Sequence, residues 1–477
     1  MEPFTLPPQG GGMCHSNPEL TGYIRVQPPT SVDLKWHREK LIPEKLGSLG
    51  NGVAGNGDIV ACTFLSLRDS LIVYDYDGNR VWSSGDILNW HAMFSVPMVD
   101  VHGRVITCDD EKIIMIDTNT KEVVWQSSLL YGGTPYSPTI TEDGTIIVAT
   151  DKGPVYAFDS TDGSLLAWKF LGDDELVRWI SYYTGIDDPG FFSTVNTPSV
   201  KGNRVYVTTK YKNRLGLSTI REDSRLYALD IDPTKPIDER ITVAWSWHFN
   251  GSTTASPTLV GDTVYFDVVP SRFNKYIVAI TDAGDHPKLK WKVSYDYITY
   301  ASFTYDPRGG MWYVDPFNQR IVRFSYDDGS IMETININDT LKSEYKDPIP
   351  RLPLRWGPRV PKVFSHLPWL PLPVYYNYGY YSSSPIVMCG TDTNPILIVG
   401  AGNTRPVYHT SSYVLAFDLS NNNELLWKFK IHEGVFNPIR YPIFGLKFLL
   451  GLATIMVKDN EPRVVFGTAL DGVYSIG

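Results

Sequence analysis

Short runs of apolar, β-prone residues alternate with polar turn residues along most of the chain. The clearest example is GPVYAFDSTDGSLLAW, residues 153–168. Residues 155–158 form one apolar run, and residues 159–163 supply turn residues, among them two aspartates and a glycine. A second apolar run follows and ends at Trp168. The stretch therefore predicts one antiparallel hairpin.

The same hairpin pattern recurs until the chain ends. Further copies are LIVYDYDGNRVW (71–82), IIMIDTNTKEVVW (113–125), LYALD with VAW (226–245), IVAITDAGDHPKLKW (277–291) and VLAFDLSNNNELLW (414–427). One copy, IVRFSYDDGSIME (321–333), lacks the tryptophan and has Glu333 or Thr334 in its place. Asp75, Asp117 and Asp159 follow one another at intervals of 42 residues. This period suits a four-stranded propeller blade and is too long for most helical repeats.

The two ends of the chain complete one another in this pattern. The last residues, GVYSIG at 472–477, stop in an eighth copy before its turn and outer strand, and residues 32–36 have the character of that missing strand. We therefore expect an all-β, eight-bladed β-propeller of four-stranded antiparallel blades, closed by pairing of the N-terminal and C-terminal segments. An open array would leave unpaired edges and exposed apolar faces. Residues 31–477 form this single propeller, and the Pro- and Gly-rich residues 1–30 form an irregular arm.

Charge and cysteine content narrow the choice of partners. The formal net charge of −9 argues against nucleic acid as a partner, because phosphate-binding surfaces need a basic excess. The four cysteines are far apart and predict neither a disulfide framework nor a zinc site. Residues 441–457, the longest apolar stretch, contain Lys447 and two glycines, so we expect no transmembrane segment, although peripheral membrane contact stays open.

The compartment and the oligomeric state are expectations of the same kind. The first residues carry Glu2 and three prolines in place of the apolar core of a signal peptide. We therefore expect a soluble protein whose compartment stays open: the periplasm or the cell exterior if the chain is a processed form, and the cytoplasm otherwise. We expect a monomer.

Several elements of the repeat carry a family resemblance. Inner strands begin with a Ser/Thr-Pro pair, at Ser137, Thr197, Ser256 and Ser384, and the following hairpin ends in Tyr-Ala-x-Asp, a glycine turn and tryptophan. This resembles the quinoprotein alcohol dehydrogenase-like superfamily, whose eight-bladed propellers are built from PQQ-like repeats, named after pyrroloquinoline quinone. In that family the repeated tryptophan docks blade against blade. The resemblance implies this role for seven residues: Trp36, Trp82, Trp125, Trp168, Trp245, Trp291 and Trp427.

Three long insertions interrupt the period. They fall mainly between the outer strand of one blade and the inner strand of the next, near residues 171–194, 342–380 and 434–450. Connections of this type emerge on one face of a propeller. We therefore expect the insertions to gather on one rim, near the mouth of the central channel, where long loops on a rigid scaffold usually carry the specific function.

The first two insertions supply the candidate binding residues of the rim. They contain arginine, tryptophan and tyrosine, which are common at binding hot spots. The candidates are Arg178, Trp179, Arg351, Arg355, Trp356, Arg359, Trp369, Tyr375 and Tyr376. The alternative for the second insertion is a lid that packs on its own propeller.

The first insertion also clusters four aspartates that are candidates for holding Ca²⁺ through carboxylate oxygens. They are Asp173, Asp174, Asp187 and Asp188. Neither pair has the alternating spacing of a calcium loop. The simpler explanation is that Asp173 and Asp174 favour the N-terminus of a short helix.

Three functions stay open at this point. The first is a non-catalytic scaffold that binds a protein, or a small-molecule or surface ligand, at the insertion-bearing rim. The second is a dehydrogenase that uses pyrroloquinoline quinone and Ca²⁺ to oxidise alcohols or sugars, and the third is a carbohydrate- or surface-binding module. We assign no catalytic residue. Many family enzymes carry adjacent cysteines beside the quinone, and this chain has none, which favours the scaffold.

The lining of the central channel separates the first two functions. Arginine, glutamate, asparagine and aspartate side chains converging over a flat tryptophan indicate the dehydrogenase. An apolar or plugged channel indicates the scaffold.

Overall fold

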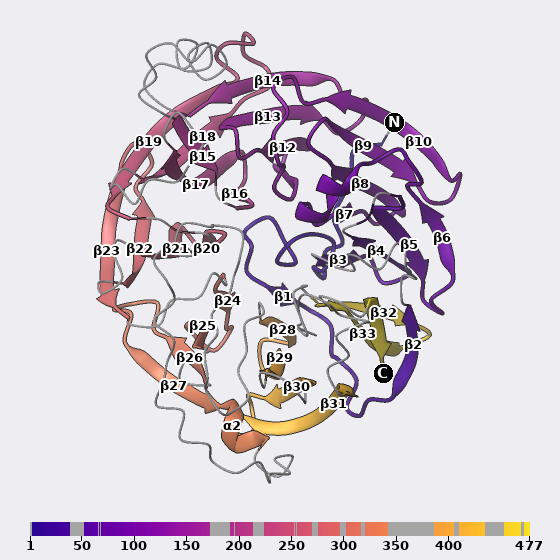
Figure 1. Ribbon diagram of the computed structural model, residues 1–477. Helices are drawn as coiled ribbons and strands as arrows, with labels where there is room; N and C mark the ends of the chain where they lie inside the picture. The colour runs from indigo at the N-terminus through magenta and orange to yellow at the C-terminus, as the bar shows by residue number, and fades with distance from the viewer. Residues whose placement is uncertain are drawn as a thin grey trace, which may run out of the picture.

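In the computed structural model, the chain forms a ring of small antiparallel sheets around a central axis (Figure 1). The structure describes residues 2–38, 52–64, 66, 68–171, 191–194, 196–212, 224–251, 253, 255–269, 275–295, 302–315, 320–341, 386–404, 410–434, 453–468 and 472–477. Their strands form eight sheets, six with four strands and two with five, here called blades 1 to 8 in chain order. The prediction of an all-β, eight-bladed propeller is confirmed.

The first four blades follow one another along the chain, each running from its inner to its outer strand. Blade 1 contains β3 (Gly52–Gly55), β4 (Ile59–Thr63), β5 (Leu71–Asp75) and β6 (Arg80–Ser83); blade 2 contains β7 (Met98–Val99), β8 (Arg104–Cys108), β9 (Lys112–Asp117) and β10 (Glu122–Ser128); blade 3 contains β11 (Thr139–Ile140), β12 (Thr145–Ala149), β13 (Pro154–Asp159) and β14 (Leu165–Phe170); blade 4 contains β15 (Phe191–Thr194), β16 (Ser199–Lys201), β17 (Arg204–Lys212), β18 (Ser224–Ile231) and β19 (Ile241–Phe249).

The last four blades include the two strands that the N-terminal segment contributes. Blade 5 contains β20 (Thr258–Val260), β21 (Thr263–Val268), β22 (Tyr276–Asp282) and β23 (Pro287–Ser294); blade 6 contains β24 (Thr304–Tyr305), β25 (Met311–Asp315), β26 (Arg320–Phe324) and β27 (Ile331–Asn336); blade 7 contains β1 (Tyr23–Ile24), β28 (Val387–Gly390), β29 (Pro395–Thr404), β30 (Thr410–Asp418) and β31 (Glu424–Gly434); blade 8 contains β32 (Ala453–Lys458), β33 (Glu461–Thr468), β34 (Gly472–Ile476) and β2 (Leu34–Arg38).

Helices are short in the described part of the chain. They are the 3-10 helix η2 (Trp90–Phe94), between blades 1 and 2, and α2 (Ile337–Thr340), after blade 6. Neither is long and apolar enough to cross a membrane.

The ring is closed by the two ends of the chain, as predicted. β2 pairs antiparallel with β34 and becomes the outer strand of blade 8, with Trp36 opposite Ser475. Beyond the strands, Asp33 and Gly477 exchange two backbone hydrogen bonds of 3.1 Å. Figure 1 shows the indigo β2 beside the yellow strands of blade 8.

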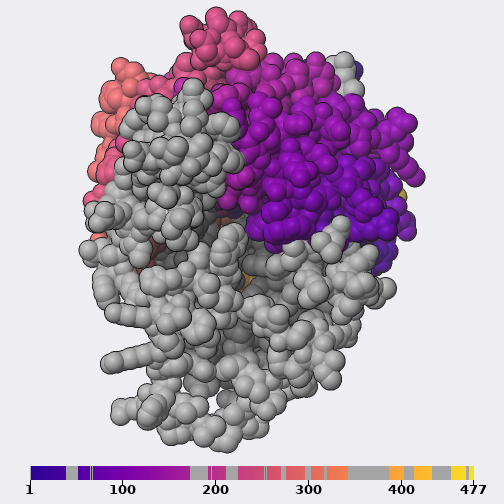
Figure 2. Space-filling view, turned by 45° about the horizontal axis from the view of Figure 1, so that its top comes forward, coloured from indigo at the N-terminus to yellow at the C-terminus, as the bar shows by residue number. Residues whose placement is uncertain are grey.

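The middle strands of each blade are buried on both faces because neighbouring blades cover both. In β9, residues 113–116 have no exposed surface, although they point alternately to the two sides of the sheet. The outer strand β10 buries only Trp125. The apolar core therefore lies between the blades. Figure 2 shows the outside of the first three blades, in indigo to purple, as one continuous surface at the right.

A recurrent contact explains why the repeat combines an outer-strand tryptophan with a glycine turn. The indole N–H of Trp36 donates to the Tyr76 carbonyl of blade 1 at 2.9 Å, and that of Trp291 donates to the Tyr326 carbonyl of blade 6 at 2.8 Å. A Cβ atom at Gly78, in the turn that receives Trp36, would lie 2.7 Å from the ring. Glycine in the turn thus lets the indole of the preceding blade pack flat against the backbone.

Trp168 departs from this arrangement in its register. In blade 7 the tryptophan partner of Ala416 is Trp427, but in blade 3 the equivalent partner of Ala157 is Ala167. Trp168 comes one residue later and therefore points to the opposite side of its sheet. There it is half-buried and packs against Tyr131, with ring centroids 4.7 Å apart, in the cluster shared with blade 2.

Blade 6, which lacks the tryptophan, has a network of ion pairs of its own, from which hydrogen bonds reach blade 7. Glu333 takes the tryptophan position, opposite Arg323, and its carboxylate lies 3.2 Å from Arg308 and 3.0 Å from Arg323. Arg308 also donates to the Leu419 carbonyl of blade 7 at 2.6 Å. A charged network therefore accompanies the loss of the indole at this interface.

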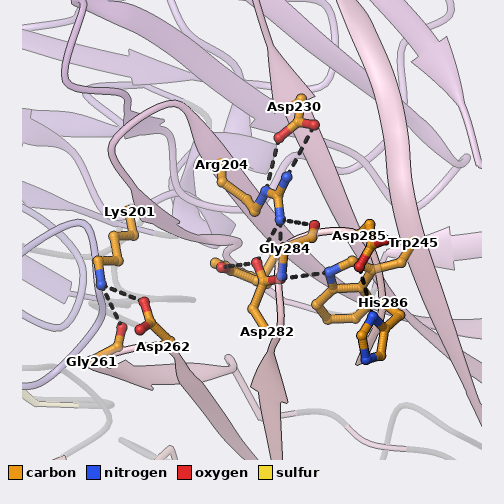
Figure 3. A network of polar contacts seen from close by, with 11 residues as sticks. Lys201, Arg204, Asp230, Trp245, Gly261, Asp262, Asp282, Gly284, Asp285 and His286 are labelled. Atoms are coloured by element: carbon orange, nitrogen blue, oxygen red, sulfur yellow. Dashed lines mark hydrogen bonds and ion pairs between the residues drawn. The ribbon is translucent and has the colours of Figure 1, made fainter. Parts of the chain in front are cut away.

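A second network joins blades 4 and 5 (Figure 3). Arg204 donates to Asp230 of its own blade at 2.8 Å, and to Asp282 and the Gly284 carbonyl of blade 5. Trp245 donates its indole N–H to the same Asp282 carboxylate at 2.9 Å. The tryptophan contact is thus combined here with an arginine bridge.

The two neighbouring tryptophans of blades 2 and 3 provide a test of this register. We expect Trp125→Ala to lower the free energy of unfolding by about 3–5 kcal/mol, because it removes a buried aromatic ring from a blade interface. Trp168→Ala should cost less, about 1–2 kcal/mol, because its ring is half-buried. Urea denaturation followed by circular dichroism measures both. Equal losses would contradict the register described here.

Candidate functional site: the central channel

The N-terminal arm enters the space enclosed by the inner strands and begins at a buried ion pair. Arg104 and Asp100, both buried, lie 2.6 Å apart in blade 2. The two outer nitrogens of Arg104 donate to the carbonyls of Glu2 and Pro3, each at 2.7 Å. The ion pair therefore holds the backbone of Glu2 and Pro3 against blade 2.

From this point the arm crosses the centre of the ring (Figure 1). Its carbonyls accept hydrogen bonds from backbone N–H groups at the inner strands of most blades. In each case the blade donates and the arm carbonyl accepts, at 2.7 to 2.9 Å. The donor and acceptor pairs are Val101 with Thr5, Gly55 with Gly11, Val99 with Gly12, Val200 with Pro18, Leu259 with Glu19, Tyr305 with Thr21, Met388 with Gly22 and Gly390 with Val26. The inner edges of six blades, otherwise unpaired, are satisfied in this way.

The arm also reaches blade 8 and the start of the inner strands. The Thr454 hydroxyl of blade 8 donates to the Gly11 carbonyl at 3.1 Å. Cys14 Sγ lies 3.6 Å from the hydroxyl of Thr197, which precedes β16.

Apolar side chains of the arm complete the packing of the blades. Phe4, Met13 and Leu20 join the cluster between blades 2 and 3, and Tyr23 joins the cluster between blades 6 and 7. All four are at most 5% exposed. The channel is therefore plugged by the chain itself, which is the feature that we took as the mark of a scaffold.

Burial in the channel perturbs two ionisable side chains of the arm. Burial lowers the pKa of His15 to about 4 and raises the pKa of the Cys14 thiol to about 11, although hydrogen bonds with Thr197 and Ser137 oppose the second change. His15 Nδ1 has no hydrogen-bond partner among the described residues. Both groups are therefore neutral near pH 7, and Cys14 is not a reactive thiolate.

Two buried carboxylates lie at the far ends of β21 and β25. Asp267 accepts hydrogen bonds from Thr253 and from Tyr313 of blade 6, each at 2.9 Å. Burial raises the pKa of Asp267 to about 7, against the effect of these hydrogen bonds. Asp315 accepts from Tyr295 at 2.7 Å and from Arg320 at 2.9 Å. Both carboxylates are thus committed to contacts within the propeller.

The arginine and the two carboxylates described above are committed to protein partners and are not available to a quinone and its calcium ion. Such a cofactor needs arginines for its carboxylates, a Glu, Asn and Asp set around Ca²⁺ and an aspartate base. Arg104 is taken by Asp100 and the arm, and Asp267 and Asp315 have protein partners. Across the described ranges, no group of three or more His, Cys, Asp or Glu side chains is arranged to hold a metal ion.

Most site residues predicted from the sequence lie outside the described part of the chain. This applies to the four aspartates near residues 173–188 and to all nine rim candidates from Arg178 to Tyr376. They stay predictions. Sequence reasoning missed the arm as the occupant of the channel, and the available signal was the run of three glycines at 10–12.

That run allows a tight turn in a crowded space. Gly10 and Gly11 have φ angles of 87° and 89°, in the left-handed region. A Cβ atom would lie 2.7 Å from the Tyr23 carbonyl oxygen at Gly10 and 2.7 Å from the Thr454 hydroxyl at Gly11. Only glycine meets both requirements without displacement of its neighbours.

Comparisons with known proteins agree with the architecture. The sequence profile of the family described as outer membrane protein assembly factor BamB matches residues 67–332, more than half of the chain. No curated protein sequence matches the chain.

Solved structures also resemble it. Among them are a europium-containing methanol dehydrogenase (12% identity, TM-score 0.57, 98% of each chain covered), the computationally designed Ika8 protein (11%, 0.53, 90% of this chain and 96% of that one) and BamB from Moraxella catarrhalis (13%, 0.46, 89% and 95%). At such identities the likeness shows the fold alone.

His15 predicts a loss of stability in acid. Its folded pKa of about 4 lies below the ordinary 6.5, so between these values the unfolded chain binds a proton that the folded chain does not. Stability should therefore fall as the pH drops from 6.5 to 4, by at most about 3 kcal/mol. His15→Asn should remove this component, and the exposed control His286→Asn should keep it. Urea midpoints between pH 4 and 7.5 provide the measurement.

Asp267 predicts a slope of the opposite sign. Its folded pKa of about 7 lies above the ordinary 3.8, so its contribution is present below pH 3.8 and is lost as the pH rises through 7. We expect Asp267→Asn to be more stable than the parent protein at pH 8, by at most about 4 kcal/mol, and close to it at pH 4. If the variant is less stable than the parent at pH 8, the ionised carboxylate stabilises the folded protein at this position, and the prediction is wrong.

Proposed function

The chain belongs to the PQQ-like repeat family of the outer membrane protein assembly factor BamB, and from this premise we propose that it is a non-catalytic binding scaffold. Its working surface is the insertion-bearing rim, and its ligand is another protein. The alternative within the superfamily is a quinone-dependent dehydrogenase.

The observation that carries the proposal is the occupation of the channel by the arm. Arm carbonyls accept hydrogen bonds from the backbone N–H groups of six inner edges, and Met13, Leu20 and Tyr23 are buried between neighbouring blades. A planar cofactor on the axis would have to displace these contacts. It would also have to find cationic partners beyond the described arginines, whose guanidinium groups bond to carboxylates, carbonyls and aromatic rings of the propeller.

The rim candidates suit a protein ligand better than a small one. In the second insertion, prolines restrict the chain and so reduce the entropy lost on binding. Trp356 and Trp369 supply large aromatic surfaces, and Arg351, Arg355 and Arg359 supply cationic ones. This composition matches the aromatic and arginine anchors of protein interfaces.

Titration of the purified protein with pyrroloquinoline quinone and Ca²⁺ tests the proposal against the dehydrogenase. A ligand of the folded state at a hundred times its Kd stabilises by about 2.7 kcal/mol, which raises the melting temperature measurably. We expect no shift, no bound-quinone absorbance and no dye-linked oxidation of alcohols or sugars. A shift together with dye reduction would establish the dehydrogenase.

The positive half of the test uses the rim. We expect Trp356→Ala with Trp369→Ala to abolish site-specific crosslinking of the rim to a protein partner in cells and to leave the melting temperature unchanged. The matched control is Trp90→Ala, which alters an exposed tryptophan of η2. A lower melting temperature with crosslinking intact would identify the second insertion as a lid.

A further inference from the structure

We infer that the central channel is a peptide-binding site and that residues 2–26 are its intramolecular ligand, so that the ring also accepts an extended peptide of this sequence in trans. This inference goes beyond the proposed rim function and does not depend on it. It concerns the axis of the ring, where the occupant is known from the structure.

The polarity of the contacts is the first argument. Outside the β1–β28 pair, N–H groups of the inner strands donate to arm carbonyls, as at Val200, Leu259 and Tyr305. Only at Tyr23–Ile24 does the arm form a strand, β1, parallel to β28. Peptides captured on exposed strand edges are held in this way, by main-chain hydrogen bonds supplemented by side-chain pockets.

Pockets at intervals along the arm provide the sequence preference. Phe4 is buried beneath the Arg104 guanidinium, 5.7 Å from its ring centre, and Met13 and Leu20 are buried between blades 2 and 3. At the other end the Tyr23 hydroxyl donates to Asp392 at 2.8 Å. These anchors are side chains of a peptide seated on completed blades, because the arm contributes only β1 to the eight sheets before residue 34.

Strain within the arm distinguishes it from the propeller strands. His15, Ser16 and Leu20 have φ angles of 50°, 75° and 56°, in the left-handed region that costs non-glycine residues free energy. His15 also buries Nδ1 without a hydrogen-bond partner among the described residues. These costs weaken the central part of the arm. The covalent connection offsets them by keeping the local concentration of the arm high.

Native-state hydrogen exchange tests the inference on the intact protein. The amides of Val200, Leu259 and Tyr305, which bond to the arm, should exchange at least about tenfold faster than the slowest amides of the β12–β13 ladder, through an opening that releases only the arm. If both groups exchange at the rate of global unfolding, the arm is part of the cooperative core and the inference is wrong.

A cut connection tests exchange in trans. A protease site inserted between the exposed residues Thr30 and Ser31 yields a nicked chain that retains every residue of the protein, including β2 for closure. A labelled synthetic peptide of residues 2–30 should replace the resident arm at a ratio of one per ring, as measured by native mass spectrometry, while the circular dichroism of the ring persists. Failure of the label to enter, or unfolding of the ring with loss of the arm, would overturn the inference.

Two variant peptides give a matched control for specificity. Gly11→Ala places a Cβ atom 2.7 Å from the Thr454 hydroxyl at a φ of 89°, so this peptide should compete at least about tenfold less well than the parent. Pro8→Ala changes an exposed position and should compete equally. Equal competition by the two variants would show that the label associates without using the channel.

Discussion

The pairing of β2 with β34, which completes blade 8, is the contact on which the interfaces between the eight blades depend. Each blade presents two apolar faces, as the fully buried residues 113–116 of β9 illustrate, so a blade without a neighbour exposes half of its core. A ring solves this problem only if its last member is complete. The outer strand of blade 8, with Trp36, comes from the other end of the chain and supplies the contact to the Tyr76 carbonyl of blade 1.

The residues on either side of the break between the chain ends make the contacts that a hairpin turn makes in the other blades. Asp33 and Gly477 exchange two backbone hydrogen bonds, and the Pro29 carbonyl accepts the indole N–H of Trp427 at 2.7 Å. In blades 1 and 6 the corresponding acceptor is a carbonyl of the turn before the outer strand. The segment that leads to β2 therefore reproduces a turn that the covalent chain lacks.

The repeat was predictable because the same physical contact recurs in sequence-readable form, with a glycine turn to receive the indole and a tryptophan to fill the interface. The register of Trp168 was not predictable, because one residue more or less before a tryptophan reverses the side of the sheet on which it lies. At blade 6 the sequence left Glu333 and Thr334 open. The structure places Glu333 both in the tryptophan register, opposite Arg323, and in the ionic network.

The path of the arm could not be predicted for a different reason. Its bonds to the blades use arm carbonyls, which every residue possesses, so the sequence shows only glycine and proline and indicates an irregular segment. The buried side chains Phe4, Met13 and Leu20 are too widely spaced to form a periodic pattern. For the rim candidates the sequence is the only guide, because they lie outside the described residues.

The inner strands impose one requirement on whatever occupies the axis of the ring. Their edges present backbone N–H groups toward a common centre, and buried donors need acceptors. A peptide meets this need along its whole length, since each residue brings a carbonyl, and it requires no cationic lining. A carboxylate-bearing cofactor would instead require guanidinium groups, and Arg104 already holds the carbonyls of Glu2 and Pro3 beside Asp100. What binds in the channel thus depends on which partner supplies acceptors for the N–H groups of the inner strands. Here the acceptors are carbonyls of residues 5–26 of the protein itself.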